Sequence, residues 1–277
     1  MKIVVVGLGV IGGSFIMALK EAGYKEVYGI DINEESLRKA KERQLIKEGY
    51  TNGNSIIKEA DLIIISLYPR LVKQFILDNK YNFKDGALIT DATGIKKFFI
   101  EDILNILPEN IDFVFGHPMA GREKKGIDFA SSQVFKGANY ILTPVSRNKP
   151  ESLDLIEDLV YKLGFKRVKR ITPEYHDEMI GFVSQLPHAI AVGLINSDVE
   201  GRETGSFIGD SYRDLTRIAN INEELWSELF LENKYNLLKS IENFEVELDK
   251  IKNAIRQDDT NTLKELFIKS TKRREKL

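Results

Sequence analysis

The chain has 277 residues, a formal net charge of -2, no cysteine and three histidines. At about 150 residues per domain, this length predicts about two domains. The lack of cysteine excludes disulfide frameworks, thiolate zinc sites, Fe–S clusters and a cysteine nucleophile. The balance of 40 basic and 42 acidic residues gives no reason to expect nucleic acid or an anionic membrane as the main partner.

The apolar N-terminal stretch, residues 3–19, resembles a short signal peptide. It contains four glycines, however, and no small-residue cleavage pattern follows it. We therefore interpret it as folded structure. No uninterrupted apolar run of about 18 residues occurs elsewhere, so we expect no membrane span and a cytoplasmic location.

Short apolar runs alternate with amphipathic segments through the first part of the chain. The predicted strands are Ile3–Val6, Val27–Ile30, Leu62–Ile65, 87–90, 113–115, 140–142 and 168–171. The predicted helices between them are 12–22, 34–43, 71–78, 97–107 and 150–163. Two of these runs, Ile3–Val6 and Leu62–Ile65, consist only of Ile, Val and Leu, as in strands buried on both faces. This alternation predicts an α/β fold in which helices cover a parallel sheet.

The alternation ends at Thr172-Pro173, which predicts a helix start with Thr as the cap and Pro as the first helical residue. The rest of the chain is almost wholly helical, so we expect two domains, 1–172 and 173–277. In the second, apolar residues recur at alternating intervals of four and three: Leu237, Ile241, Phe244, Leu248, Ile251 and Ile255. This seam packs either within its own domain or against a second subunit. We favour a homodimer, because so small a helical domain has little of its own to bury the seam.

A glycine-rich motif follows the first predicted strand and opens a helix. Its residues are Gly7, Leu8, Gly9, Val10, Ile11 and Gly12, a G-x-G-x-x-G pattern. Glycines allow the tight turn, the approach of a pyrophosphate and close helix–strand packing, and the helix N-terminus supplies N–H groups to the anion. In this context the motif predicts a dinucleotide site.

Asp31 ends the second predicted strand, about 20 residues past the motif, where a carboxylate binds the ribose 2′-hydroxyl. A carboxylate repels a 2′-phosphate and no arginine follows directly, so we predict NAD rather than NADP. The alternative is that Asp31 only caps the next helix. The loop Ser66-Leu67-Tyr68-Pro69 should lie at the carboxyl edge of the sheet, beside the cofactor.

The three histidines lie in different settings. His117 follows an apolar strand inside Gly116–Gly121 and suits removal of a hydroxyl proton; the alternative is a surface-loop histidine. His188, next to Pro187, either lines a cleft or lies in the core. We interpret His176 as structural or as a partner of Asp177. Without an i, i+4 histidine pair, we predict no metal site.

Two arginines follow a glycine-containing loop near the start of a predicted helix. Arg213 and Arg217 are candidates for binding a carboxylate. The alternative for Arg213 is a surface ion pair with Asp210 or Asp214.

Taken together, these motifs resemble the prephenate/arogenate dehydrogenase family. The matching segments are GLGVIGGS, residues 91–96 (DATGIK), GHPMAG, residues 184–188 (SQLPH), RDLTRIA and Trp226. The resemblance implies a Rossmann-like, mostly parallel sheet domain followed by an all-α dimerisation domain. It implies NAD-dependent oxidative decarboxylation of prephenate to 4-hydroxyphenylpyruvate in tyrosine biosynthesis, with arogenate as the alternative substrate. His117 would be the catalytic group, and His188, Arg217 or Arg213, Trp226 and Gln185 would form the substrate site.

The chain departs from the family pattern at two positions. Gly94 stands where the family often has a serine that touches the catalytic histidine and the cofactor, so such a hydroxyl would come from Thr93 or be absent. Thr93 and Gly94 remain candidates for cofactor contacts. Gln185 stands where the family has the first histidine of S-H-L-P-H.

Two further functions remain as alternatives. One is another small dehydrogenase of the same two-domain plan, such as a β-hydroxyacid dehydrogenase. The other is a non-catalytic NAD-binding sensor, which would bind the cofactor without turnover. Neither the choice between prephenate and arogenate nor sensitivity to tyrosine follows from the sequence.

Overall fold

The computed structural model describes residues 1–53, 55–121 and 124–277. Its first part is built on a six-stranded sheet in which all neighbouring strands are parallel, in the order β3-β2-β1-β4-β5-β6. The strands are β1 (Ile3–Val6), β2 (Val27–Ile30), β3 (Gly49–Tyr50), β4 (Leu62–Ile65), β5 (Leu88–Asp91) and β6 (Asp112–Val114). This order is that of a dinucleotide-binding sheet, with its crevice between β1 and β4. The predicted α/β fold is confirmed.

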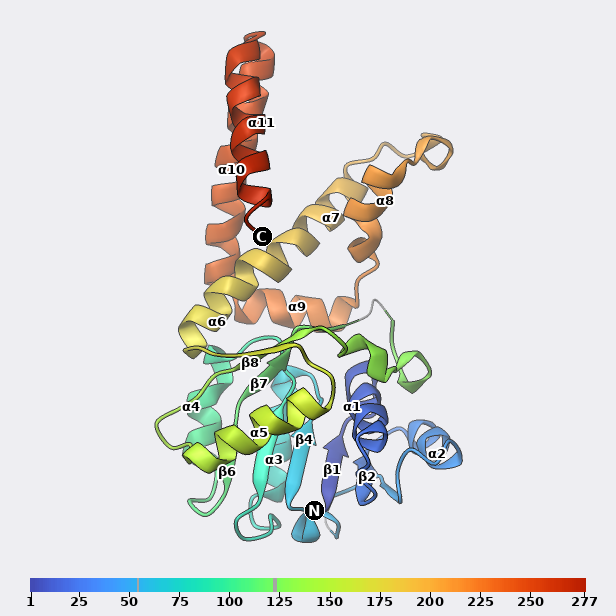
Figure 1. Ribbon diagram of the computed structural model, residues 1–277. Helices are drawn as coiled ribbons and strands as arrows, with labels where there is room; N and C mark the ends of the chain where they lie inside the picture. Colours follow the sequence, from blue (N-terminus) through green and yellow to red (C-terminus); the bar gives the residue numbers. More distant parts are fainter. Residues whose placement is uncertain (54, 122–123) are drawn as a thin grey trace.

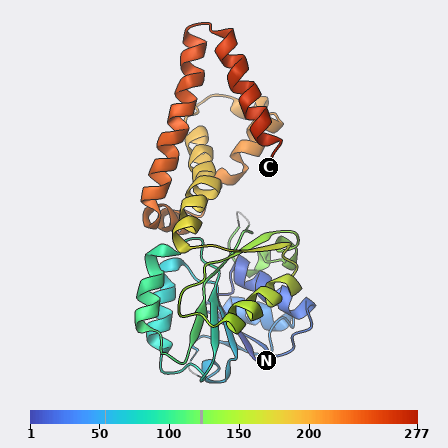
Figure 2. The same cartoon turned by 60° about the vertical axis from the view of Figure 1, so that its left-hand side comes forward.

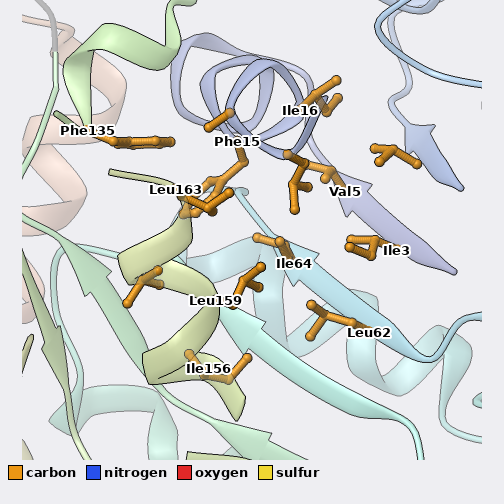
Figure 3. Close-up of a cluster of buried hydrophobic side chains, with 14 of the residues drawn as sticks. Ile3, Val5, Phe15, Ile16, Leu62, Ile64, Phe135, Ile156, Leu159 and Leu163 are labelled. Carbon is orange, nitrogen blue, oxygen red and sulfur yellow. The ribbon is translucent and has the colours of Figure 1, made fainter. Parts of the chain in front are cut away.

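Helices cover both faces of this sheet (Figure 1). The helices are α1 (Val10–Glu21), α2 (Glu34–Glu42), α3 (Pro69–Asn79), α4 (Lys97–Ile106) and α5 (Pro150–Lys162). Along β1, Ile3 and Val5 join a buried cluster with α1 and α5, part of which Figure 3 shows. Val4 and Val6 join a second cluster with α3 and α4. Because both faces are buried, the strand sequence is continuously apolar.

A second, three-stranded sheet differs from the prediction. It contains β7 (Gly116–Pro118), β8 (Asn139–Leu142) and β9 (Arg167–Arg170), with β7 antiparallel to β8. The strand expected at 113–115 corresponds to β6, and β7 was not predicted. Residue 116 must be glycine for the strands to pack in this way, since a Cβ there would lie 2.2 Å from the buried Tyr140 hydroxyl. The two-residue strand β3 was not predicted.

The second part of the chain is helical, as expected. Its α-helices are α6 (Pro173–Ile180), α7 (Leu186–Asn196), α8 (Asp210–Thr216), α9 (Glu223–Glu232), α10 (Lys234–Arg256) and α11 (Thr260–Arg274). The Thr172 side chain accepts a hydrogen bond from the Tyr175 N–H, and Pro173 is the first helical residue, so the predicted helix start is confirmed. A π-helical turn, η4 (Gly181–Gln185), joins α6 to α7. The short 3-10 turns are η1 (Ile57–Glu59), η2 (Ile127–Phe129), η3 (Ser132–Val134), η5 (Thr204–Phe207) and η6 (Arg217–Ala219).

The hairpin of α10 and α11 projects away from the sheet domain (Figures 1 and 2). Near its base, Leu237 of the predicted seam is 5% exposed. Farther along, Leu248 and Ile255 are 49% and 59% exposed. The seam is therefore buried within its own domain only at one end, and its other end presents apolar side chains to the surroundings.

The continuous helical segment 173–196 passes a length and composition test for a membrane span, with a mean hydropathy of 1.4 and 28% of the tested window buried. Core helices of soluble proteins pass the same test. This segment also carries Asp177, which accepts the backbone N–H groups of Lys96 and Lys97 in the sheet domain. These bonds tie the segment to the sheet domain, so we interpret it as a helix that joins the two domains.

Candidate active site

The glycine motif forms the turn between β1 and α1. Gly7 has a φ of +84° and its N–H binds the Ile30 carbonyl oxygen at 2.8 Å. A Cβ on Gly12 would lie 1.8 Å from the Gly7 oxygen, whereas a Cβ on Gly9 would meet nothing within 4 Å. The turn is therefore closed on the protein side and open at Gly9, and no side chain caps the N-terminus of α1. This geometry suits a bound pyrophosphate.

The Asp31 carboxylate lies beside this turn. Its Oδ2 accepts the Leu8 N–H at 2.6 Å and its Oδ1 accepts the Asn33 N–H at 2.8 Å. The cap of α2 is Asn33, whose side chain accepts from the Glu35 and Ser36 N–H groups. Asp31 is therefore not the helix cap, and its position at the glycine turn matches that of a ribose ligand.

The loop from Ser66 to Pro69 lies against the same turn, between β4 and α3. A Cβ on Gly7 would lie 2.6 Å from the Ser66 oxygen. Ser66 Oγ is buried and has no hydrogen-bond partner in the described part of the chain. Tyr68 reaches the helical domain, because its hydroxyl accepts from Asn222 Nδ2 at 2.9 Å. The loop is therefore at the sheet edge where it was predicted, and it also contacts the second domain.

His117 lies in β7, at the carboxyl edge of the main sheet. The N–H of its neighbour Gly116 binds Asp91 Oδ1, at the end of β5, at 3.0 Å. The imidazole Nδ1 lies 2.9 Å from Nε2 of His176. Burial, and then the neighbouring His176 and Lys96, hold the pKa of His117 well below its usual 6.5. The side chain is therefore a neutral imidazole near pH 7, as a general base requires.

His176 is fully buried in α6, and its Nδ1 lies 2.6 Å from Asp177 Oδ1. The predicted partnership with Asp177 is confirmed. The contact with His117 was not predicted, because the two histidines lie in different domains and no sequence spacing relates them. The helix start at Thr172-Pro173 was the only signal that placed His176 at the domain boundary.

Thr93 and Gly94 occupy the loop after β5. The Thr93 hydroxyl is buried and bonds to the Asp91 carboxylate, the Ile95 carbonyl and Lys96 Nζ. The hydroxyl is therefore already engaged by three partners, which does not favour the predicted catalytic role. A Cβ on Gly94, in contrast, would lie 3.8 Å from His117 Nε2. The missing serine would thus have stood beside the base.

A second cluster forms around His188 at the start of α7. Its imidazole stacks on Trp226 of α9 with ring centroids 3.6 Å apart. Its Nδ1 lies 2.8 Å from the Ser184 carbonyl oxygen, so Nδ1 carries a proton. Leu229, one turn beyond Trp226 on α9, borders Gly94. Helix α9 therefore links the two histidine clusters.

The other three predicted substrate-binding residues, Arg217, Arg213 and Gln185, lie in different parts of the helical domain. Arg217 lies in η6, which packs against α7, the helix that carries His188. Arg213 pairs with Asp210 at 2.6 Å on the exposed face of α8, which is the surface ion pair considered as its alternative. Gln185 is buried, its Nε2 donating to the Leu229 oxygen and its Oε1 accepting from Asn233. Both ends of the Gln185 amide are therefore engaged in joining helices.

A buried ion pair near His117 was missed by the sequence reasoning. Lys96 Nζ lies 2.6 Å from Asp91 Oδ2, and both side chains are fully buried. Burial lowers the pKa of Lys96, an effect that Asp91 opposes. Within the described residues, no group of three or more His, Asp or Glu side chains has the arrangement of a metal site.

Comparison with known proteins gives a consistent assignment. Residues 15–169 match the profile "Prephenate dehydrogenase, nucleotide-binding domain" and residues 172–269 match "Prephenate dehydrogenase, dimerization domain". The chain is 34% identical to a prephenate dehydrogenase of Lactococcus lactis, over 99% of this chain and 77% of that protein.

Two solved structures are similar over nearly their whole length. One is the prephenate dehydrogenase of Aquifex aeolicus in complex with hydroxyphenyl propionate and NAD+, with a TM-score of 0.89, 34% identity and coverage of 99% of this chain and 98% of that one. The other is the arogenate dehydrogenase of Synechocystis, with a TM-score of 0.83, 28% identity and coverage of 100% and 99%. The chain belongs to the prephenate dehydrogenase family.

Proposed function

We propose that the protein is an NAD-dependent dehydrogenase that oxidatively decarboxylates prephenate to 4-hydroxyphenylpyruvate, in tyrosine biosynthesis and in the cytoplasm. The observation that carries the proposal is the imidazole of His117 at the carboxyl edge of the sheet, with Nδ1 bonded to His176 and Nε2 facing Gly94. The same fold and family in an enzyme of this name, solved with NAD+, support it.

The residues at the β1–α1 turn fit the cofactor. The open backbone at Gly9 leaves room for a pyrophosphate, and the uncapped N-terminus of α1 offers N–H donors. Asp31 suits a ribose hydroxyl and opposes a 2′-phosphate. NAD, when bound, supplies the acceptor for the hydride that leaves C4 of the substrate ring.

The protein's own residues hold the substrate and take one proton. His117 accepts the proton of the C4 hydroxyl at Nε2 while the hydride departs, so C4 becomes a ketone. The C1–carboxylate bond then breaks, CO2 leaves, and the electron pair passes through the ring to the C4 oxygen. That oxygen takes the proton back from His117 Nε2, which gives the aromatic phenol and restores the neutral base. His188 and Arg217 bind the substrate's carboxylates. Binding through Nε2 of His188 requires the protonated ring, because its Nδ1 proton is already donated to Ser184.

Arogenate is the second candidate substrate, and the similarity to the Synechocystis arogenate dehydrogenase favours testing it. It differs from prephenate only by an amino group in place of the side-chain keto group. Steady-state formation of NADH with each substrate, and with NAD and NADP, tests the proposal. The expected result is the highest kcat/KM with prephenate and NAD. Turnover of a 3-hydroxy acid, or NAD binding without turnover of either substrate, would replace the proposal by one of the alternatives.

Substitution of Asp31 tests the cofactor assignment. We expect Asp31→Ala to weaken NAD binding by about 10- to 100-fold, as for loss of a hydrogen bond to a charged group, and to improve the use of NADP relative to NAD. Binding is measured by calorimetry with each cofactor. Asn33→Ala is the matched control, because it removes the α2 cap without touching the ribose position. An equal loss in both variants would assign Asp31 a purely structural role.

We propose that two copies of the chain form a homodimer through the helical domain. The exposed apolar end of the α10 seam and the apolar face of the 173–196 segment support this arrangement. Leu248→Glu with Ile255→Glu should convert the dimer to a monomer, measured by light scattering after size exclusion. Tyr81→Glu, which changes an 87%-exposed aromatic residue in the sheet domain, should leave the mass unchanged. A dimer that survives the double substitution places the interface elsewhere.

A further inference from the structure

We propose that His176 and Asp177 are positioning residues that hold His117 in the one tautomer able to act as a base. The proposal rests on the proposed function, because it assigns the two residues a task in the same proton transfer. It concerns a chain of contacts that crosses the domain boundary, from His117 in β7 to His176 and Asp177 in α6.

The chain of contacts is continuous and its far end is fixed. His117 Nδ1 to His176 Nε2 measures 2.9 Å, and His176 Nδ1 to Asp177 Oδ1 measures 2.6 Å. Asp177 also accepts the Lys96 N–H at Oδ1 (2.9 Å) and the Lys97 N–H at Oδ2 (2.8 Å). These two N–H groups lie at the N-terminus of α4. The side chain of the N-cap residue, Lys96, makes no capping hydrogen bond there. A helix N-terminus favours a negative charge, so Asp177 is well placed as a carboxylate.

The direction of each hydrogen bond follows from that carboxylate. A carboxylate only accepts, so His176 Nδ1 carries the proton between them. In a neutral ring the other nitrogen, Nε2, is then an acceptor. Nδ1 of His117 must therefore carry the proton it donates to His176, which leaves Nε2 of His117 with a free lone pair. Nε2 is the nitrogen that faces Gly94 and that takes the substrate's proton in the proposed mechanism.

Both rings are neutral in the resting protein, as this assignment requires. Burial lowers the pKa of His176, and the hydrogen bond to Asp177 opposes that effect. The charged groups around the pair are Asp177 on α6, Lys96 before α4 and Asp91 at the end of β5. When His117 becomes an imidazolium, its Nδ1–H bond to His176 strengthens. The negative charge of Asp177, at the other end of this series of hydrogen bonds, stabilises the imidazolium.

Removal of the acceptor on residue 176 tests the proposal. In His176→Leu, Nδ1–H of His117 would be buried without an acceptor, which favours the tautomer protonated at Nε2. We expect kcat to fall by about 10- to 100-fold, with the dissociation constant for NAD unchanged. His176→Gln can accept at Oε1 and donate to Asp177 from Nε2, so it should restore most of the turnover. Ile180→Val, a smaller buried side chain on the same helix, is the control for packing and should keep the wild-type kcat.

The tautomer itself can be read without any substrate. The chain has only three histidines, so imidazole 15N–1H correlation spectra of 15N-histidine-labelled protein can be assigned by substitution. We expect a proton on Nδ1 of His117 in the wild type and in His176→Gln, and on Nε2 in His176→Leu. An Nδ1 proton in all three, or equal turnover of the Leu and Gln variants, would overturn the proposal. Correct tautomers without prephenate turnover would instead contradict the proposed function.

Discussion

His117→Asn should lose most of the turnover while it retains NAD binding. Loss of a general base costs about 10²- to 10⁴-fold in rate, and the asparagine side chain offers no lone pair of comparable basicity at the position of Nε2. The cofactor turn and Asp31 lie elsewhere on the sheet edge, so the dissociation constant for NAD should stay within about twofold, a change far below 1.4 kcal/mol. Single-turnover formation of NADH and calorimetric titration with NAD measure the two quantities.

The pH profile of the wild type provides an independent check on the same assignment. Burial lowers the pKa of His117 below 6.5, so the free base persists as the pH falls past that value. The acid limb of kcat/KM that belongs to this group should therefore lie below pH 6.5, and it should vanish from the residual activity of His117→Asn. Unchanged turnover in the variant, or an unchanged acid limb, would remove His117 from the role of base.

The elements that could be predicted from the sequence are those with a local cause. The predicted bounds of β1, β2 and β4 are correct, and β1 and β4 are continuous runs of Ile, Val and Leu. The Thr172-Pro173 pair placed the start of α6. The strands β8 and β9 were predicted, but β7 and the pairing of these three strands in a separate sheet were missed, because that pairing is a tertiary contact. Local patterns carry no record of such contacts.

The same distinction applies to the candidate site. The glycine turn, Asp31 and His117 each lie next to a predicted strand, and that strand indicates their position at the sheet edge. The part played by His176 and the internal position of Gln185 depend on residues from other elements, namely His117 in β7 and Asn233 before α10. The ion pair of Arg213, in contrast, could be predicted as an alternative, because its partner Asp210 is only three residues away.

Lys96→Met should be strongly destabilising, because it leaves the Asp91 carboxylate buried without its cation. Breaking a buried pair on one side costs about 3–5 kcal/mol, so the free energy of unfolding in urea should fall by that amount. Lys73→Met makes the same change in an exposed pair, in which Lys73 and Asp102 lie 2.5 Å apart, and should cost about 1 kcal/mol or less. If both variants lost the same stability, the buried pair would not be a special feature of this fold.

Asp91→Asn combined with Lys96→Met separates stability from catalysis. The double substitution leaves no unpaired charge and should recover much of the stability. It should not recover full turnover, because Asp91 binds the Gly116 N–H next to His117 and the Lys96 side chain, which fixes that carboxylate, is lost. The backbone N–H of residue 96, which binds Asp177, remains in the variant. A double variant with recovered stability and reduced kcat would show that the buried pair sets the position of the base as well as the stability of the sheet.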